Sequence, residues 1–353
     1  ISASETEHIA AIEVSGAMRG TRLRADELRL TVREVAVAAS GNVRFSGDWP
    51  LDLKLEWSLV NDPALSGSGT ASGSLEQLSL EQTVQLPESV NLKAQLSDVW
   101  SKRSFDVTLN APANQTVTIN DFTLTNPEAR ITGTFDTYDI QAKASVSSTQ
   151  LPDVIRFSAT GTGSNTLLSV TKFTAETLNG EIELAGLLNF DTLELEADVV
   201  TRDLNLTSFD PRLPDDLGAR AQLIGQLPER INVAFESLTG TLEAVALSGS
   251  GGLEWTNETL RAQQFALNAG TNSARIDGLV WPQLAADFAL NLTEPGLLIP
   301  DAAGRLFASG RVGGSQTAPE ISVSARGDEL MWASIRIDTL SLDASIAGEG
   351  AID

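Results

Sequence analysis

The chain has 353 residues, of which 42% are hydrophobic and only 5% are aromatic, and its formal net charge at pH 7 is −23. That charge makes nucleic acid a poor partner, because phosphate backbones bind basic surfaces. The chain has no cysteine and one histidine, His8, which excludes disulfides and thiol nucleophiles and argues against a zinc site. We therefore expect no enzyme activity, no metal and no cofactor.

Apolar and polar residues alternate along most of the chain after a possible first helix at residues 1–12. In the first clear case Leu51, Leu53, Leu55 and Trp57 point to one side, and the residues between them are polar or charged. A period of two is typical of a half-buried β-strand. The same pattern recurs at residues 105–109, 140–146, 193–199, 231–235, 288–292, 321–323 and 340–346.

Short turn-forming segments separate these predicted strands, for example Asn61-Asp62-Pro63 and Gly270-Thr271-Asn272. Besides residues 1–12, helical periodicity is confined to residues 214–219 and 300–306, and no run of about 18 apolar residues could cross a bilayer as a helix. No long helix is therefore available to cover the apolar face of a sheet. The remaining architectures are a sandwich, a closed barrel, a solenoid, or a long sheet folded lengthwise.

Internal repetition favours an array of related units. The pattern Val43-x-Phe45-x-Gly47-x-Trp49 returns in related form at residues 129–135, 182–188 and 274–280, and residues 206–218 resemble residues 292–304. Diverged repeats of several strands are typical of arrays in which each unit contacts its neighbours. We expect residues 1–353 to be one continuous segment of a longer protein, with approximate repeat units at 41–128, 129–181, 182–273 and 274–353.

The glycine-rich and tryptophan-containing segments give no catalytic signature. Residues 66–69 and 248–252 are rich in Ser and Gly, but neither is followed by the Gly-Lys-Ser/Thr of a phosphate-binding loop, so we expect turns or bulges there. The six tryptophans have two open interpretations: core anchors, or contacts with an amphipathic ligand.

Several segments together resemble the TamB family, within the AsmA-like group of bridge-like lipid transfer proteins of Gram-negative envelopes. The most telling is residues 310–321, GRVGGSQTAPEI, followed by ARGDELMW at 325–332 and an amphipathic strand at 335–342. The glycine-spaced segments at residues 65–75 and 238–251 have the same character. The resemblance extends over most of the chain.

The resemblance implies an all-β fold: a long, curved, mostly antiparallel sheet folded into an open groove, with few short helices. It implies a periplasmic segment whose apolar groove carries phospholipid acyl chains between the inner and outer membranes and so supports outer-membrane biogenesis. The full-length protein would be anchored in the inner membrane by an N-terminal segment that this chain lacks. Its partner would be an outer-membrane barrel of the Omp85 class, similar to TamA.

On this hypothesis the apolar strand positions line the groove. Two alternatives remain open: a scaffold that assists assembly of outer-membrane and autotransporter proteins with an Omp85-class partner, and an adhesin built from an array of β-sandwiches. The predicted lining residues are Leu51, Leu53, Leu55, Trp57, Phe105, Val107, Leu109, Ile140, Val146, Leu193, Leu195, Val199, Val233, Phe235, Phe288, Leu290, Leu292, Ile321, Val323, Leu340 and Leu342.

Overall fold

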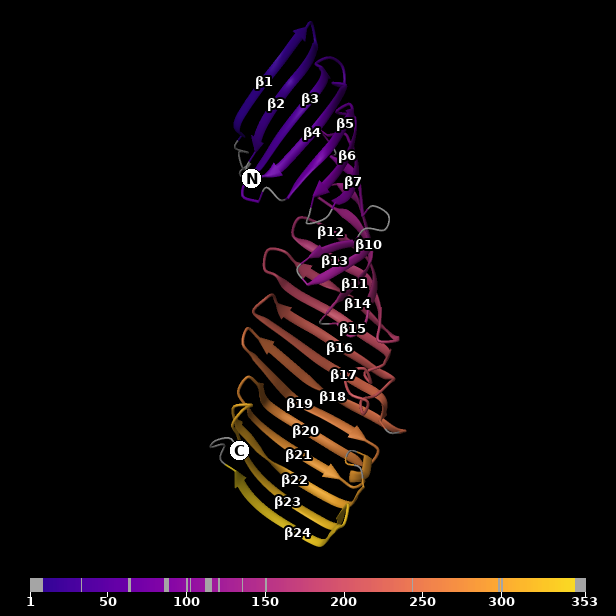
Figure 1. Cartoon of the computed structure of the whole chain (residues 1–353), viewed down its shortest axis with the longest axis vertical. Helices are drawn as coiled ribbons and strands as arrows, with labels where there is room; N and C mark the ends of the chain where they lie inside the picture. Colours follow the sequence, from indigo (N-terminus) through magenta and orange to yellow (C-terminus); the bar gives the residue numbers. More distant parts are fainter. Residues whose placement is uncertain are drawn as a thin grey trace. The chain divides into compact units, whose positions relative to one another are not determined.

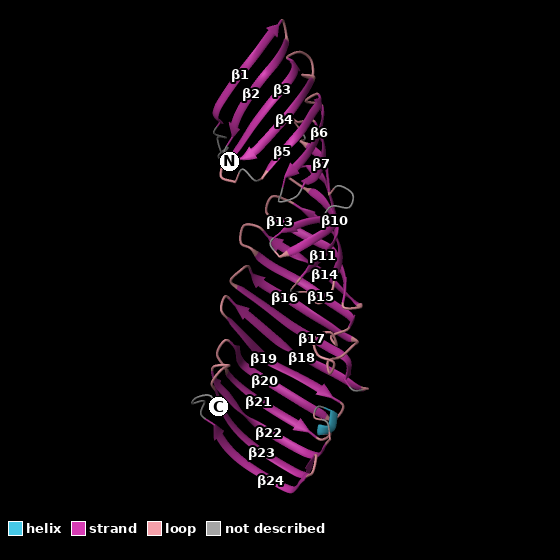
Figure 2. Ribbon diagram, in the orientation of Figure 1, coloured by secondary structure: helices cyan, strands magenta, loops and turns pink. Residues whose placement is uncertain are grey.

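The computed structural model describes residues 9–346, except 33, 63–64, 86–88, 100, 102, 112–115, 120, 135, 150, 243, 298 and 300. His8 lies outside the described residues. Within them every regular element is a β-strand apart from one turn of 3-10 helix, η1 (Pro295–Leu297) (Figure 2). All described strand pairs are antiparallel, so the prediction of an all-β antiparallel fold is confirmed. The chain divides into two compact units, Ile1–Thr166 and Leu167–Asp353, called unit 1 and unit 2 below.

Unit 1 is a curved sheet whose strands lie side by side almost in chain order (Figure 1). The one departure is that β8 and β9 both pair with β10, at successive positions along it, so the two short strands share one place in the sheet. The strands are β1 (Ile9–Arg19), β2 (Arg22–Val32), β3 (Val35–Arg44), β4 (Leu51–Leu59), β5 (Ser66–Gly73), β6 (Gln77–Gln85), β7 (Ser89–Ser97), β8 (Ser104–Asn110), β9 (Thr116–Ile119), β10 (Phe122–Thr134), β11 (Tyr138–Ser148) and β12 (Ile155–Gly163).

Unit 2 is an uninterrupted meander in which each strand pairs with the next along the chain (Figure 1). A single sheet of sequentially paired strands differs from the two facing sheets of a sandwich. The strands are β13 (Leu167–Thr177), β14 (Gly180–Asn189), β15 (Glu194–Leu204), β16 (Leu217–Gln226), β17 (Arg230–Leu242), β18 (Val245–Thr256), β19 (Thr259–Ala269), β20 (Asn272–Trp281), β21 (Ala285–Leu292), β22 (Ala302–Gly314), β23 (Pro319–Trp332) and β24 (Ile335–Ile346).

Glycine allows several strands to bend while they stay paired. Gly41 in β3 has a φ of 143°, a value that is nearly restricted to glycine, and a Cβ there would overlap the carbonyl oxygen of Asp52 on β4. Gly133 in β10 and Gly278 in β20 combine a similar φ with a similarly close facing strand. Glycines inside strands commonly mark such bends. Among the four copies of the repeated glycine pattern, Gly133 and Gly278 thus mark bends, Gly186 lies in β14 without a positive φ, and Gly47 lies in the turn after β3.

The helix predictions are wrong wherever the structure describes them. Residues 9–12 belong to β1, residues 217–219 to β16 and residues 302–306 to β22, while residues 1–8 lie outside the described part. A short apolar run fits both the period of a helix and the period of a strand, and pairing with a neighbouring strand decides which of the two forms. The single helical turn, η1, lies just before the stretch for which a helix is predicted.

The Ser- and Gly-rich segments are strands. Residues 66–69 form the start of β5 with regular pairing on both sides, so the predicted turn is wrong. Residues 248–252 lie inside β18, where the register shifts between Ser250 and Gly252 and Gly251 has a φ of 132°; here the predicted bulge is confirmed.

The internal repetition corresponds to a spacing of six strands in unit 2. Gly186 lies in β14 and its counterpart Gly278 in β20. The matching blocks, residues 206–218 and 292–304, connect β15 to β16 and β21 to β22. The division into four repeat units stays a prediction.

Candidate functional site

In each unit the strand register collects apolar residues into rows that run from strand to strand on one face, called here the apolar face. A row in unit 1 reads Ala25, Gly41, Leu53, Ala71, Leu80, Ala94, Val107, Ile131, Ile140 and Gly161. A row in unit 2 reads Gly186, Ala197, Leu223, Val233, Leu253, Ala262, Gly278, Ala286, Val312, Ile321 and Ile346. Because side chains alternate across a strand, neighbouring rows on the same face repeat every second residue.

The register places all but one of the predicted lining residues on the apolar face of their own unit. The exception is Leu193, which precedes β15 in a turn, has a φ of 56° and is 42% exposed. The sequence did not reveal this turn, because apolar residues alternate without interruption through residues 193–199. That these residues line a lipid groove stays a prediction.

Small residues complete the apolar face, and the sequence-based list of lining residues omitted them. On β5 the apolar face carries only Gly67, Gly69, Ala71 and Gly73, and the indole of Trp57 lies over Gly67. The sequence could have identified these positions, because they continue the same period-two alternation. They were omitted because the prediction selected only large apolar side chains.

The apolar face is the sheltered side of each sheet, as alanines on the two faces demonstrate. Ala286 on the apolar face of β21 is 1% exposed, whereas Ala285 and Ala289 of the same strand, on the other face, are exposed. All twelve alanines that are buried among the described residues belong to the apolar face. Since the side chain is the same, the difference comes from the surroundings.

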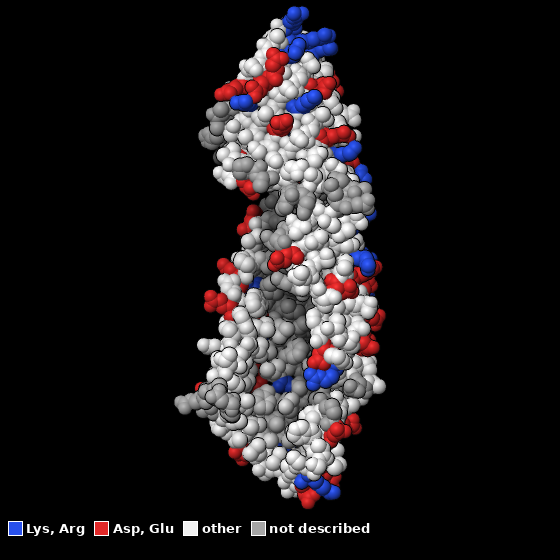
Figure 3. Space-filling model, in the orientation of Figure 1, with Lys and Arg blue, Asp and Glu red and all other residues white. Residues whose placement is uncertain are grey.

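The sheltered face is nevertheless not a closed core. The buried hydrophobic residues of the described part are twelve Ala, three Val and three Leu, with no Phe, Trp, Ile or Met among them. The chain exposes 22187 Å², whereas two separate compact units sharing its 37.4 kDa would expose about 16,500 Å². In the space-filling view unit 2 is hollowed along its middle, with most of the visible charged groups at the margins (Figure 3). The large apolar side chains thus form an open wall.

The opposite face of each sheet is polar and carries ion pairs between neighbouring strands. Arg130 on β10 pairs with Asp106 on β8, with 2.6 Å between Nη2 and Oδ2, and this hydrogen bond lowers the pKa of the Asp106 carboxyl. Lys93–Glu81 and Lys143–Glu128 pair at 3.1 Å and 2.9 Å. In unit 2 Arg202 pairs with Glu183 at 2.7 Å and Arg311 with Asp287 at 3.0 Å. Such exposed pairs add little stability each but mark the face that water covers.

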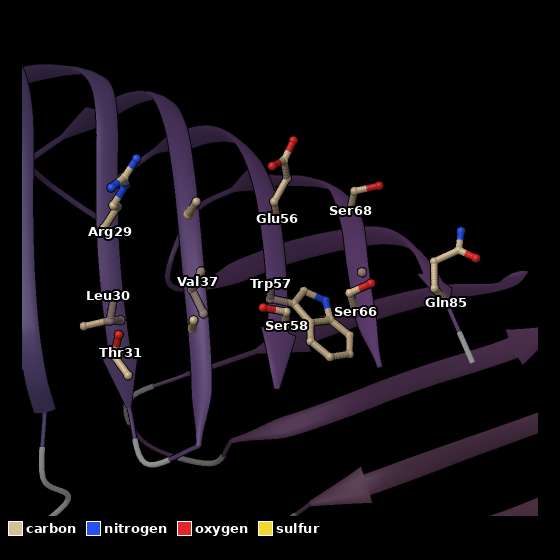
Figure 4. Close-up of a pocket in the computed structure, with 13 residues that line it drawn as sticks. Arg29, Leu30, Thr31, Val37, Glu56, Trp57, Ser58, Ser66, Ser68 and Gln85 are labelled. Carbon is tan, nitrogen blue, oxygen red and sulfur yellow. The ribbon is translucent and has the colours of Figure 1, made fainter. Parts of the chain in front are cut away.

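A depression in unit 1 belongs to this polar face (Figure 4). Its walls are two rows of side chains on β2 to β6 that include Arg29, Glu56, Ser58 and Ser68, and its floor is the backbone of the apolar-face row between them. Most of the side chains in these walls are small, and four of them carry hydroxyl groups: Thr31, Ser58, Ser66 and Ser68. The depression is therefore separate from the apolar face and contains no concentrated charge.

Among the described residues, two polar side chains on the apolar faces have a buried oxygen without a hydrogen-bond partner. Gln82, opposite Gly69, donates its amide Nε2 to the Thr70 carbonyl oxygen at 3.4 Å, while its Oε1 is buried and has no partner. In unit 2 the buried Oγ1 of Thr201, on β15, also has none. Unpaired buried oxygens cost free energy. The alternation of their strands places both residues on the apolar face, but it does not show that their oxygens lack partners.

The described residues contain no group of three or more His, Cys, Asp or Glu side chains that could hold a metal ion. None of their helices is long and apolar enough to cross a membrane. The feature that distinguishes the molecule is therefore the pair of extended apolar faces.

Comparison with known proteins agrees with this geometry. A family model described as "TamB, N-terminal domain" matches residues 1–353, the whole chain. No solved structure was found to match it. TamB is a transport or assembly module of the Gram-negative envelope and is not known as an enzyme family. Because this all-β antiparallel chain is matched along its full length by the family model, it belongs to the TamB family.

Proposed function

We propose that this chain binds phospholipid acyl chains on its apolar faces and conducts lipid between the inner and outer membranes, supporting outer-membrane biogenesis. One observation carries the proposal: each unit orders its large apolar side chains in rows on a sheltered face, yet leaves them partly exposed. Monomeric proteins seldom leave large contiguous apolar surface without a ligand or partner. An acyl chain is a ligand of matching shape and chemistry.

The energetics need no catalytic group. Each methylene that leaves water gains about 0.8 kcal/mol, so a saturated acyl chain lying on the apolar face avoids most of the cost of crossing an aqueous space. Rows that continue from strand to strand offer similar contacts at successive positions, which lets a chain slide without a deep trap. The polar faces and the net charge of −23 keep the protein itself in water.

The family supplies the proposed setting. The segment would lie in the periplasm of a Gram-negative bacterium, within a full-length protein anchored in the inner membrane. An Omp85-class barrel similar to TamA would receive its cargo at the outer membrane. Phospholipid acyl chains and this barrel are the proposed partners.

The test compares two neighbouring residues of β21. Phe288 faces the apolar side, opposite Ile276 and Gly310, while Ala289 faces the polar side and is exposed. Phe288→Glu places a carboxylate in the proposed lipid path, where an unpaired charge costs several kcal/mol to cover, and should lower phospholipid occupancy by about tenfold or more. Ala289→Glu should leave occupancy unchanged. Native mass spectrometry of the purified chain measures occupancy, and transfer between donor and acceptor vesicles measures conduction.

A photo-crosslinking residue at position 288 separates this proposal from a scaffold that assembles outer-membrane proteins. Lipid adducts support conduction. Adducts to protein strands without lipid, together with equal occupancy of the two glutamate variants, would overturn it.

A further inference from the structure

Two tryptophans of unit 2 form a stacked pair at one margin of its apolar face. Trp255 lies near the end of β18 and Trp281 at the end of β20, with ring centroids 5.5 Å apart and ring planes inclined by 18°. Leu260 on the intervening strand β19 is opposite both of them, so the two rings lean together over it. Each tryptophan is 39% exposed.

The pair marks a boundary between apolar and polar surroundings. Its row, which also contains Ile231, is the last apolar row before the turns that join β16 to β17 and β18 to β19. These turns lie side by side, because the Asn257 backbone N–H donates to the Glu229 carbonyl oxygen at 3.1 Å. The exposed carboxylates of Glu229 and Glu258 therefore lie in the turns just beyond this row.

The indole is suited to such a boundary, because its ring is apolar and its N–H requires an acceptor. In the described residues neither indole N–H of the pair donates a hydrogen bond to another protein group. The same tendency places tryptophan at the level of the lipid headgroups in membranes. A rim of this kind fits a ligand with an apolar end and acceptor oxygens at the other.

We propose that Trp255 and Trp281 form a rim subsite for the glycerol-ester region of a phospholipid whose acyl chains lie on the adjoining apolar rows. The inference rests on the proposed function and assigns an orientation to the lipid within it. The ring faces pack on the glycerol and the first methylenes, and the N–H groups donate to ester or phosphate oxygens. The headgroup then points toward the turns that carry Glu229 and Glu258.

The length of an acyl chain agrees with this orientation. Gly251 precedes Trp255 by four residues, about 13 Å along an extended strand. Phe235 lies opposite Gly251, and its ring meets that of Phe265 with centroids 6.0 Å apart. One leaflet of a bilayer holds chains about 15 Å deep. A chain anchored at the pair therefore ends near these two phenylalanines.

Quenching of tryptophan fluorescence by dibrominated phosphatidylethanolamine tests the orientation. The purified chain is loaded with lipid brominated either near the ester or near the methyl end, and vesicles are removed by gel filtration. In the native chain we expect stronger quenching by the bromines near the ester. We define the ratio as quenching by the bromines near the ester divided by quenching by the bromines near the methyl end. This ratio should fall about twofold in the double variant Trp255→Phe, Trp281→Phe, because the two bromine positions are separated by an acyl chain about 15 Å long.

Trp332 supplies the matched control, because it is exposed and lies at the end of β23, which runs opposite to β18 and β20. The ratio should be unchanged in Trp332→Phe. If lipid binds but the ratio is the same in the double variant, the rim subsite is refuted while the proposed function stands. If neither lipid quenches the native chain, the proposed function itself fails. Quenching that requires intact vesicles would assign the pair to contact with a bilayer surface and overturn its role with a carried lipid.

Discussion

Substitution of two glycines six residues apart should affect unit 1 very differently. Gly41 and Gly47 both have positive φ values, 143° and 64°. A Cβ at Gly41 would overlap the Asp52 carbonyl oxygen and lie 3.0 Å from the Leu53 Cα, whereas a Cβ at Gly47 would meet no atom within 4 Å. Alanine at both positions therefore compares backbone strain with and without a steric clash.

The magnitudes follow from these contacts. Gly47→Ala should cost about 1–2 kcal/mol, the penalty for a left-handed residue with a Cβ. Gly41→Ala carries backbone strain of about 1–3 kcal/mol and must also move β3 from β4, which adds an overpacking cost of about 1–3 kcal/mol. With a urea m-value of about 2 kcal/mol/M, the Gly41→Ala midpoint should fall by about 1–3 M.

Urea unfolding followed by hydrogen exchange in peptides from β2 to β5 measures the effect within unit 1. Exchange resolves the two units, which a single optical signal does not. Gly41→Ala should accelerate exchange across β3 and β4, and Gly47→Ala should affect mainly the turn before β4. Equal midpoints for the two variants would refute the argument that close strand approach, in addition to positive φ, requires glycine in these strands.

Three further outcomes are expected. Val90→Ala should lower the stability of unit 1 by about 1.5–3 kcal/mol, because Val90 is only 1% exposed; a loss below 0.5 kcal/mol, within the range of about ±0.5 kcal/mol for surface substitutions, would contradict its burial. Tyr138→Phe should cost about 0.5–1.5 kcal/mol in urea unfolding, since its hydroxyl donates to the Ser164 carbonyl oxygen at 3.2 Å. The Arg212 side chain lowers the pKa of Asp210 to about 2, so the stabilisation from this pair is present above the ordinary aspartate pKa and is lost as pH falls from about 4 to about 2. Carboxyl NMR should find the Asp210 midpoint near 2 and, in Arg212→Gln, a midpoint nearer 4; unchanged midpoints would contradict the pairing.

The sequence predicted the strands well wherever alternation was regular. In β4 the residues Leu51, Leu53, Leu55 and Trp57 specify both the strand and the face it shelters, because a one-residue slip would turn every side chain over. The family resemblance, carried by residues 310–321, is confirmed by the match over the full chain. Local pattern was sufficient here because each strand pairs with its chain neighbour.

The sequence failed where a residue's conformation depends on its partner strand. Leu193 continues an apolar alternation, yet its φ of 56° places it in a turn that only the pairing of β14 with β15 reveals. The glycines of β5 look like a turn, yet neighbouring side chains such as Trp57 cover them and make a strand favourable. Gln82 continues the alternation of Leu78 and Leu80 and so falls on the apolar face, but only the structure shows that its Oε1 has no partner there.

The neighbour-to-neighbour pairing of unit 2 has a consequence for how the chain is made. Its most widely separated ladder partners, Glu194 and Gln226, are only 32 residues apart. Each new hairpin can therefore close on the strand before it while the rest of the polypeptide is still being delivered from one end, and loop-closure entropy stays small at every step. In the proposed periplasmic setting, where the chain crosses a translocation pore before it folds, no early strand waits with an unpaired, aggregation-prone edge for a distant partner still to emerge.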